Sequence, residues 1–397
     1  MIVAIEPSWT GTIHAPGNST LLDIAKLAFP AQQLAIYAEA GHVQEVKSLL
    51  KAACSPTVQF HTIELSPDFL HRPHIVSFKR LFKELQTIGK ALSSVPSGED
   101  CLLILLSATS TSMVAANLIA RLRRGRTFIQ AQLHGNLNEL TDWRHGDPVR
   151  RALDLKSVLS RPHGGRMRYL VLEEFIRTRL AALNPATTEI TDVLPHPLAL
   201  QGHTQTEKPL EPPLRVGLVG LGSEEKGMGA FLRIARQLKE ELGDRVRFHH
   251  VGTFVKGTDL SLYALLEEPP AEKQLTRQEF LARINRLHYV VFPFKENYYG
   301  LSASGTFMDA VAALKPVIAT RIPLTEQFFR EFGEIGHLCD GEAEMISTIR
   351  NIALNPDPAA YRAQAEMMRK GRAARSLEAL APRYRDIVRK ALPGFAA

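Results

Sequence analysis

The sequence has few cysteines, and their placement argues against two kinds of site. Cys54, Cys101 and Cys339 are the only three cysteines among 397 residues, and no two of them stand in a Cys-x-x-Cys spacing. An odd, scattered set is untypical of a disulfide framework or a zinc site and typical of a reducing compartment. We therefore expect a cytoplasmic protein. No Asp-x-Asp motif stands at the end of an expected strand, so we also expect no metal.

Long apolar runs are absent as well. The strongest one, CLLILLSA at Cys101–Ala108, is far shorter than the roughly 20 residues that span a bilayer. The opening MIVAIEPSW carries Glu6 and no basic leader, so it resembles a first strand more than a signal peptide. We expect neither a membrane span nor a signal peptide.

The composition is that of a soluble globular protein with a basic excess. It is 45% hydrophobic and 22% charged, and its 397 residues suit two domains. The net charge of +7 favours anionic partners such as nucleotide phosphates or lipid headgroups. No module that combines aromatic and basic residues in the manner of a nucleic-acid-binding protein is present, so we expect no nucleic-acid partner.

Apolar strand patterns alternate with helical patterns along the first half. Near-continuous apolar strands between helices predict a parallel sheet that is covered on both faces. The expected strands of this half are Ile2–Ile5, Gln33–Ala38, Val58–Leu65, Cys101–Leu106, Thr127–Leu133, Arg168–Leu172 and Thr191–His196. The expected fold class is thus α/β.

A segment rich in Pro, Gln and Thr interrupts this alternation at His196–Arg215 and has the composition of a linker. The alternation then restarts. We predict two Rossmann-like doubly wound domains facing a central cleft, residues 1–198 and 215–380, joined by a linker at 199–214. The terminal helix at 381–397 could cross back to the first domain. A ligand would lie at the carboxyl ends of the strands.

A glycine-rich turn follows the first strand of the second half, in the stretch RVGLVGLGSEEKGMGAFLRIARQLKEEL. It is not a dinucleotide fingerprint, because Glu225 stands where the third glycine belongs, nor a Walker A loop, because Met228 follows Gly227. What remains is Gly222, Lys226 and Gly227 before a helix. Small residues let the backbone approach an anion, and the lysine adds a positive charge. The turn is a candidate phosphate site; the alternative is a tight turn with an exposed lysine.

A second candidate anion site lies in the stretch FPFKENYYGLSASGTFMDAVAALKPVIA. Ser304 is the expected helix N-cap, and Gly305 leaves the helix start open to an anion. Asp309 lies on the same helix side as Gly305 and Thr306, where its carboxylate can accept hydrogen bonds from ribose hydroxyls. Tyr299 and its neighbour are candidates for stacking on a base. The alternative is that the serines and Asp309 only cap a helix and that the tyrosines only pack.

The Lys-Gly loop and the downstream block together resemble the donor half of GT-B glycosyltransferases, over Arg215 to Asp340. In that superfamily the diphosphate of a nucleotide sugar sits between such a loop and such a helix. The resemblance implies that Lys226 contacts phosphate, that Ser304 to Thr306 cradle the diphosphate, and that Asp309 holds ribose. It also implies a nucleoside-diphosphate sugar as donor substrate, UDP as the expected nucleotide, and no separate cofactor.

The sequence departs from the pattern of that superfamily in two places, the glutamate pair of the block and an arginine of the loop. Many retaining members carry two glutamates separated by seven residues here. If Asp309 takes the second position, Leu301 stands in the first; if Glu296 is the first, Ser304 is the second. The arginine usually found five residues before the loop lysine is Leu221. These departures indicate a divergent branch and leave the retaining or inverting outcome open.

The first half carries the candidate acceptor side. The opening EPSWTGTIHAPGNSTLLDIAKLAFP places His14 and Asn18 after the first strand, and QLHGNLNEL places His134 and Asn136 after a later one. The carboxyl ends of parallel strands share one edge of a sheet, so both loops can open on one cleft. The opening is similar to that of bacterial polysaccharide glycosyltransferases, resembling family 4.

Glycosyl transfer needs a positioned acceptor hydroxyl and, for inversion, a base. His14, His134 and Glu174 are the candidates, in that order, because histidine titrates near neutral pH and a carboxylate also serves. The alternative for any one histidine is a capping or surface residue. His196, between two prolines, is interpreted as linker geometry.

Basic clusters occur at Arg121–Arg126 and Arg144–Arg151, with Trp143 beside the second. They could rest on an anionic membrane that presents a lipid-linked acceptor; the alternative is a solvated helix end. The resulting hypothesis is a hexosyl or related transferase in cell-surface polysaccharide or glycolipid synthesis, peripheral at the inner membrane face. The rival hypotheses are a non-catalytic GT-B-like nucleotide-binding partner and a UDP-sugar epimerase on the same fold.

Overall fold

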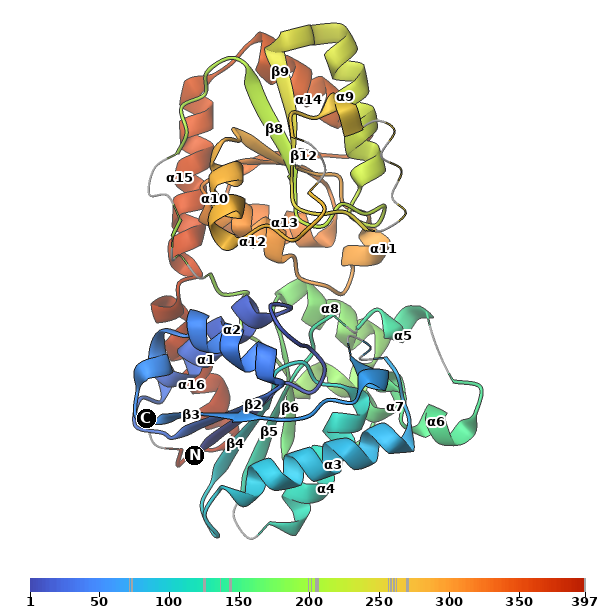
Figure 1. Ribbon diagram of the computed structural model, residues 1–397, viewed down its shortest axis with the longest axis vertical. Coiled ribbons are helices and arrows are strands. Elements are labelled where there is room, and N and C mark those ends of the chain that lie inside the picture. The colour runs from blue at the N-terminus through green and yellow to red at the C-terminus, as the bar shows by residue number, and fades with distance from the viewer. Residues whose placement is uncertain are drawn as a thin grey trace. The chain divides into compact units, whose positions relative to one another are not determined.

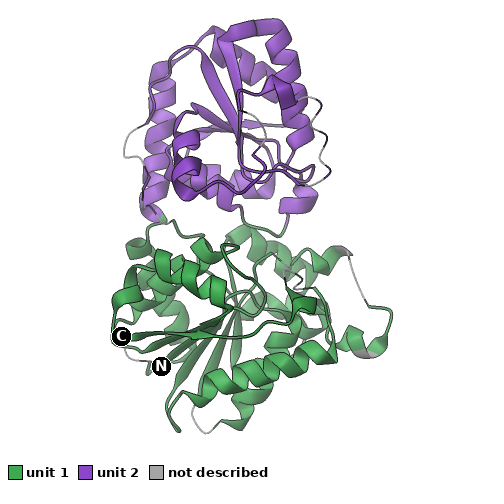
Figure 2. Ribbon diagram, in the orientation of Figure 1, with its two compact units in different colours: residues 1–199, 301–303, 375–397 green, residues 200–300, 304–374 purple. Residues whose placement is uncertain are grey.

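The computed structural model describes residues 1–395 except 71, 73, 124, 125, 136, 143, 144, 199, 201, 204–206, 256, 258, 260, 262, 269 and 270. The chain divides into two compact units (Figure 2). Unit 1 comprises residues 1–199, 301–303 and 375–397, and unit 2 comprises residues 200–300 and 304–374. Each unit is a parallel sheet with helices on its faces (Figure 1).

Unit 1 is built on a seven-stranded sheet in the order β3-β2-β1-β4-β5-β6-β7. Neighbouring strands are parallel, and Ile2 of β1 pairs with Leu34 on one side and Leu102 on the other. The strands are β1 Ile2–Ile5, β2 Leu34–Ala38, β3 Val58–Thr62, β4 Cys101–Leu105, β5 Thr127–Gln132, β6 Met167–Val171 and β7 Thr191–Val193. The chain order reverses beside β1, so the loops after β1 and β4 meet at a switch point.

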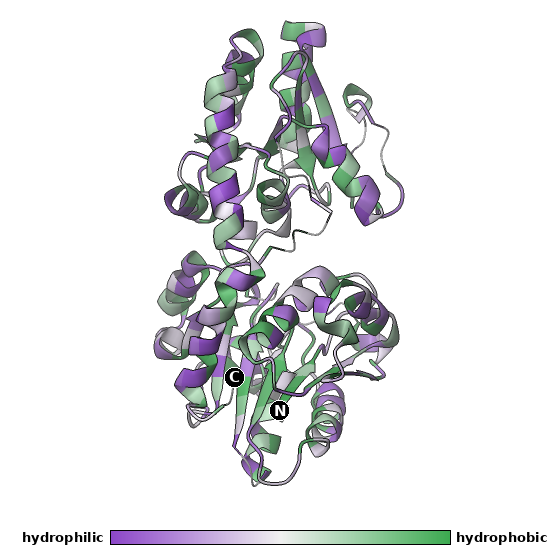
Figure 3. Ribbon diagram, turned by 90° about the vertical axis from the view of Figure 1, so that its left-hand side faces the viewer, coloured by the Kyte–Doolittle hydropathy of each residue, from purple (hydrophilic) through white to green (hydrophobic). Residues whose placement is uncertain are grey.

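Helices cover the faces of this sheet. Their bounds are α1 Ala15–Ala28, α2 Ala40–Leu49, α3 Phe78–Ser93, α4 Ser110–Leu122, α5 Glu139–Asp142, α6 Pro148–Ala152, α7 Leu155–Leu159, α8 Glu174–Leu183 and α16 Leu377–Ala391. The strands are predominantly hydrophobic, while the helices mix hydrophobic and hydrophilic residues around their circumference (Figure 3). That contrast is the pattern of a two-sided buried sheet under amphipathic helices.

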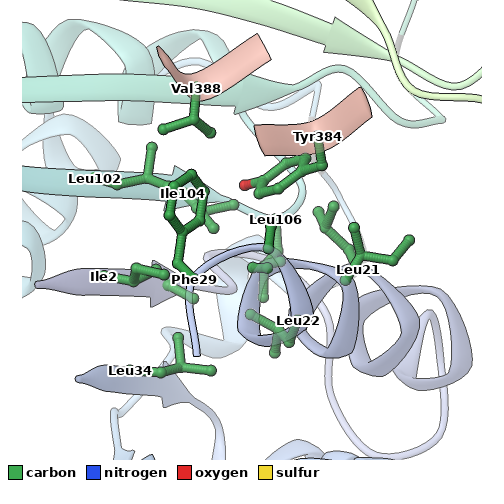
Figure 4. Close-up of a cluster of buried hydrophobic side chains, with 14 of the residues drawn as sticks. Ile2, Leu21, Leu22, Phe29, Leu34, Leu102, Ile104, Leu106, Tyr384 and Val388 are labelled. Carbon is green, nitrogen blue, oxygen red and sulfur yellow. The ribbon is translucent and has the colours of Figure 1, made fainter. Parts of the chain in front are cut away.

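The last helix of the chain belongs to the core of the first unit. Tyr384 of α16 is fully buried, its ring meets Phe29 at 6.5 Å between centroids, and its hydroxyl donates to Gln130 Oε1 at 2.7 Å (Figure 4). The side chain of Ser376 caps the helix by accepting from the amide of Ala379. The helix therefore starts at Leu377 and the unit boundary lies before Arg375, several residues ahead of the sequence-based boundary at 380/381.

Unit 2 carries a five-stranded parallel sheet in the order β12-β11-β10-β8-β9. The strands are β8 Leu214–Val219, β9 Val246–Val251, β10 Tyr289–Phe292, β11 Val317–Thr320 and β12 Gly336–Cys339. The helices are α9 Met228–Leu242, α10 Arg277–Asn285, α11 Glu296–Tyr299, α12 Gly305–Ala312, α13 Pro323–Phe332, α14 Glu342–Leu354 and α15 Pro358–Ala374. The predicted α/β class with two Rossmann-like domains is confirmed.

Two elements differ from the sequence-based reading. The edge strand β12 has no clear strand pattern in the sequence, because GHLC is short, only partly buried and without the apolar run of an inner strand. The terminal helix, expected at 381–397, is α16 and already starts at Leu377, and α15 ends before it at Ala374. None of the described helices is both long and apolar enough to cross a membrane.

Replacing Tyr384 tests whether α16 is an integral part of unit 1. We expect Tyr384→Ala to lower the free energy of unfolding by about 3–5 kcal/mol, because the cavity lies in a closed core. Tyr384→Phe should cost about 1 kcal/mol, since Gln130 loses its hydroxyl donor. Urea denaturation gives both values. Arg389→Ala, an exposed change on the same helix, is the control and should stay within about 0.5 kcal/mol; equal effects of all three variants would contradict an integral α16.

Candidate functional site

The glycine-rich loop of unit 2 lies directly against the segment that leads into α12. A Cβ atom on Gly220 would stand 2.4 Å from Cγ2 of Thr306, and one on Gly227 would stand 2.0 Å from the carbonyl oxygen of Pro293. Both glycines have positive φ, +100° and +82°. Side chains are thus excluded from both positions. The two candidate anion sites of the sequence, far apart in the chain, are brought together.

Lys226 sits at the end of this loop, just before α9. Burial lowers the pKa of its ammonium group, and no partner for that group is found among the described residues. Its backbone amide donates to the hydroxyl of Ser223, which holds the turn. A partly buried cation without a counter-charge favours an anionic ligand, because the ligand would offset its desolvation.

The start of α12 offers hydrogen-bond donors next to this loop. Ser304 is the N-cap: its hydroxyl accepts from the amide of Phe307 at 3.2 Å and contacts the hydroxyl of Thr306 at 3.2 Å. The amides of Gly305 and Thr306 have no acceptor in the described part of the chain, as expected in a first helical turn. Gly305 is exposed, and a Cβ there would meet nothing within 4 Å. The helix end is therefore open to an anion.

Asp309 is held by an arginine that sequence reasoning missed. Arg277 Nη1 donates to Asp309 Oδ1 at 3.1 Å, and Nη2 of the same guanidinium contacts His203 Nε2 at 2.7 Å. Burial raises the pKa of Asp309, and Arg277 partly opposes that effect. Burial and the nearby Arg277 lower the pKa of His203 to about 3, so the ring is neutral and accepts from the guanidinium. The capping signal of Thr276 predicts a helix start at Arg277, but nothing local indicates its partner.

The two tyrosines of this block differ in exposure. Tyr299 is 3% exposed, and its ring packs on Phe294 with 3.9 Å between centroids. Tyr298 is 37% exposed. The structure thus places Tyr299 in the aromatic core of unit 2 and leaves Tyr298 as the ring with an accessible face.

In unit 1, a buried glutamate organises the loop after β1. Glu6 is 0% exposed; its carboxylate accepts from the amides of Ser8 and Trp9 and from the side chains of Asn18 and Ser107. Burial raises the pKa of Glu6, while these four donors favour the charged form. Asn18, the predicted acceptor-side residue, is itself 3% exposed, and its amide nitrogen donates to Glu6. The structure therefore gives Asn18 a supporting role behind the loop.

The two candidate histidines meet at the carboxyl ends of β1 and β5. The ring of His14 stacks on Trp9 at 4.5 Å and meets His134 edge-on at 4.4 Å. His14 precedes α1 with φ of 62°, a conformation that non-glycine residues rarely adopt and that is common at functional sites. The sequence predicts that the loops after β1 and β5 open at one edge of the sheet. The contact between His14 and His134 shows that these two loops do meet there.

Burial lowers the pKa of His134 to about 4. Its imidazole is therefore neutral near pH 7 and has a nitrogen lone pair available to accept a proton. Burial lowers the pKa of His196 to about 4 as well, and the nearby ring of His134 adds to this effect. His196, interpreted from the sequence as linker geometry, thus belongs to the histidine cluster of unit 1.

Glu174, the third catalytic candidate, lies on the surface, whereas its neighbour Glu173 is buried. Glu174 pairs on the surface of α8 with Arg177, Nε to Oε1 at 2.9 Å, and each side chain is 46% exposed. Glu173 is 0% exposed and accepts two hydrogen bonds from Arg375, at 2.9 and 3.1 Å, and one from the amide of His196. Sequence reasoning missed this buried ion pair, because Arg375 lies 202 residues after Glu173 in the chain.

Two further predictions concern the limits of the site. Asn136, the second acceptor-side residue, lies outside the described residues, as do Arg124, Gly125 and Trp143 of the basic segments. Within the described ranges, no group of three or more His, Cys, Asp or Glu side chains could hold a metal ion.

No family model and no curated protein matches the sequence. Solved structures do match over the whole chain. A glycosyltransferase from Rickettsia africae ESF-5 matches with a TM-score of 0.69 and 11% identity, over 99% of this chain and 98% of its own. The chain has the GT-B fold. The predicted resemblance is thus confirmed at the level of the fold.

Two further GT-B neighbours have similar scores. WaaG, a glycosyltransferase involved in lipopolysaccharide biosynthesis, gives a TM-score of 0.61 at 12% identity over 98% of this chain and 99% of its own. A mutant of S. aureus TarM, in complex with fondaparinux, alpha-GlcNAc-glycerol and UDP, gives 0.61 at 12% over 97% and 99%.

A matched pair of glycines tests the packing of the donor-side loop. We expect Gly227→Ala to destabilise unit 2 by more than about 2 kcal/mol, because its φ is +82° and the new Cβ would collide with the Pro293 carbonyl. Gly305→Ala should leave the free energy of unfolding within about 0.5 kcal/mol, since its Cβ would point into open space. Chemical denaturation followed by fluorescence measures both. Equal losses would mean that the loop does not approach Pro293.

The buried histidines predict an acid-side loss of stability. The pKa of His134 is about 4 in the folded protein against an ordinary 6.5, so the unfolded chain binds more protons between these values. The contribution of His134 is complete above about pH 6.5 and is lost as the pH falls towards 4. We expect His134→Gln to unfold with a shallower pH dependence in this window, measured as the urea midpoint against pH. Parallel curves for the two proteins would contradict the assigned pKa.

Proposed function

We propose that the protein is a glycosyltransferase, which moves a sugar from a nucleoside-diphosphate sugar to a hydroxyl group of a glycan or lipid-linked saccharide. The expected nucleotide is UDP, and the expected setting is the synthesis of cell-surface polysaccharide or glycolipid. The observation that carries the proposal is that the loop bearing Lys226, whose partly buried ammonium has no partner among the described residues, packs against the start of α12. A positive charge and free amides in one place are what a diphosphate requires.

The donor half of the reaction requires that the leaving diphosphate is stabilised and that the ribose is held in place. As the bond between the anomeric carbon and the β-phosphate oxygen breaks, its electron pair stays on that oxygen. Lys226 and the amides of Gly305 and Thr306 would stabilise the developing charge. Asp309 would hold the ribose hydroxyls, with Arg277 setting the orientation of its carboxylate.

The acceptor half needs its hydroxyl oriented and its proton removed. The acceptor oxygen forms the new bond to the anomeric carbon and gives up its proton, to a base or to the departing phosphate. His134 is a candidate base of unit 1, because its imidazole is neutral near pH 7 and can accept a proton. His14 packs against it, and Glu174, occupied by Arg177 on the surface, is the weaker candidate.

The GT-B neighbours support the same class of reaction. One is a glycosyltransferase of lipopolysaccharide synthesis, and another was crystallised with UDP and saccharide ligands. The free cysteines fit the proposed cytoplasmic setting. A lipid-linked acceptor would bring the protein to the inner face of a membrane, where the basic segment Arg121–Arg126 would meet anionic headgroups.

A nucleotide-binding panel tests the proposal. The purified protein is heated with UDP, GDP, ADP, TDP and CMP in turn, because a ligand that binds only the folded state raises the midpoint by mass action. We expect UDP to raise it and Lys226→Met to weaken UDP binding about 10–100-fold, the usual cost of losing a charged contact to phosphate. Asp309→Asn should also weaken binding. Calorimetric titration gives the dissociation constants.

The control is Lys370→Met, which removes an exposed lysine of α15 in the same unit. It should leave UDP affinity unchanged. If no nucleotide binds, or if Lys226→Met binds UDP as tightly as the wild type, the donor site is not where we place it. If UDP binds but no saccharide acceptor releases it from a UDP-sugar, the non-catalytic nucleotide-binding alternative replaces the transferase.

A further inference from the structure

A buried histidine on β9 contacts the Gly220–Gly227 loop of unit 2. His250 is 1% exposed, and its Nε2 lies 2.9 Å from the carbonyl oxygen of Gly220. The ring also packs against the next glycine of the loop, since a Cβ on Gly222 would stand 3.1 Å from Cε1 of His250. His250 therefore meets the first residues of the loop at two points.

The partners of His250 determine which of its ring nitrogens carries the hydrogen. A carbonyl oxygen can only accept, so Nε2 carries the hydrogen that is donated to Gly220. Nδ1 is then a bare acceptor, and it accepts from the hydroxyl of Tyr263, which is 4% exposed. Burial lowers the pKa of His250 to about 4, so the ring is neutral near pH 7. Hydrogen bonds thus run in one direction, from the Tyr263 hydroxyl through the imidazole to the Gly220 carbonyl.

The backbone does not provide a donor for this carbonyl. Just beyond the paired strands β8 and β9, the amide of Gly220 still donates to the carbonyl of Val251 at 2.8 Å. No backbone amide of the described residues donates to the carbonyl of Gly220 in return. Gly252 lies against that carbonyl, because a Cβ on Gly252 would stand 2.0 Å from the Gly220 oxygen. The ring of His250 therefore supplies the donor that the strand ladder omits.

The hydrogen bond from His250 is made at the residue where the loop meets α12. A Cβ on Gly220 would stand 2.4 Å from Cγ2 of Thr306, in the first turn of that helix. A rotation of the Gly220 peptide would therefore change the spacing between the loop and the helix start. Lys226 follows six residues later in the same loop. The orientation of one peptide thus bears on both parts of the candidate anion site.

We propose that His250, held in one tautomer by Tyr263, is a positioning residue for this anion site. Its Nε2–H group fixes the peptide of Gly220, and so sets how the loop bearing Lys226 faces the amides of α12. His250 acts through the loop and not by contact with the ligand. The inference rests on the proposed function for the identity of that ligand, a nucleoside diphosphate, whereas the hold on the loop is a property of the fold.

Two measurements on the full-length protein test the proposal: hydrogen exchange of residues 218–228 by mass spectrometry, and UDP affinity by calorimetric titration. We expect His250→Leu to speed exchange in this segment about 10-fold and to weaken UDP binding about 10-fold, because the loop loses its side-chain donor. His250→Gln keeps an amide donor and should bind UDP within about 2-fold of the wild type. Tyr263→Phe should weaken binding about 3–5-fold, because the imidazole loses the donor that selects its tautomer.

The matched control is His249→Gln, at the neighbouring residue of β9. Successive side chains of a strand point to opposite faces, and the ring of His249 contacts Glu268 at 2.9 Å. This variant should keep the exchange of the loop and the UDP affinity of the wild type. Thermal midpoints are recorded for every variant, so that a loss of stability is seen separately from a loss of affinity.

A purely structural histidine would give a different result. If His250→Leu lowers the thermal midpoint but keeps the UDP affinity and the loop exchange of the wild type, the proposal is overturned. Equal losses of affinity in His250→Leu and His250→Gln would overturn it as well. If His250→Leu does not fold, Tyr263→Phe decides by the same two measurements. If the wild type binds no UDP, the proposed function fails, and the exchange of the loop still decides whether His250 holds it.

Discussion

The close approach between the Gly220–Gly227 loop and the Pro293–Thr306 segment is the constraint on which the donor-side site depends. Only residues without a Cβ fit at Gly220 and Gly227, because the facing atoms would lie within 2.4 Å of it. That contact puts a lysine and an open helix end, contributed by β8–α9 and β10–α12, in one place. Backbone packing, more than any pair of side chains, therefore assembles the candidate anion site.

In unit 1, buried charged side chains position the loops around the candidate site. A buried carboxylate, Glu6, gathers the loop after β1, and the buried pair of Glu173 and Arg375 ties the end of β6 to the chain's last segment. Both are charged groups in an apolar interior, and both are satisfied by several hydrogen bonds, as buried charges must be. Burial also lowers the pKa values of His134 and His196, so both rings are neutral near pH 7.

The clearest patterns in the sequence were the periods of the strands and helices and the positions of the glycines. Apolar strands separated by amphipathic helices indicated the parallel sheets, and strand–glycine–helix turns indicated where Lys226 and Ser304 stand. Patterns failed where the local signal was weak: β12 is a short edge strand, and the break at Ser376 lies within a continuous helical pattern. Single residues show the same limit, since the sequence does not indicate that Tyr299 and Glu173 are buried while their neighbours Tyr298 and Glu174 are partly exposed.

By itself, the sequence determined the α/β class, the two-domain division and the loops that carry candidate chemistry, because strand and helix periods and glycine positions are local properties. Only the tertiary structure decided the partners of those residues: Arg277 on Asp309, Arg375 on Glu173 and Tyr384 on Gln130. Each pair joins residues from distant elements, and their meeting depends on how strands order in the sheet and how helices pack over it. Burial, which sets the pKa values of the histidines, follows from the same packing.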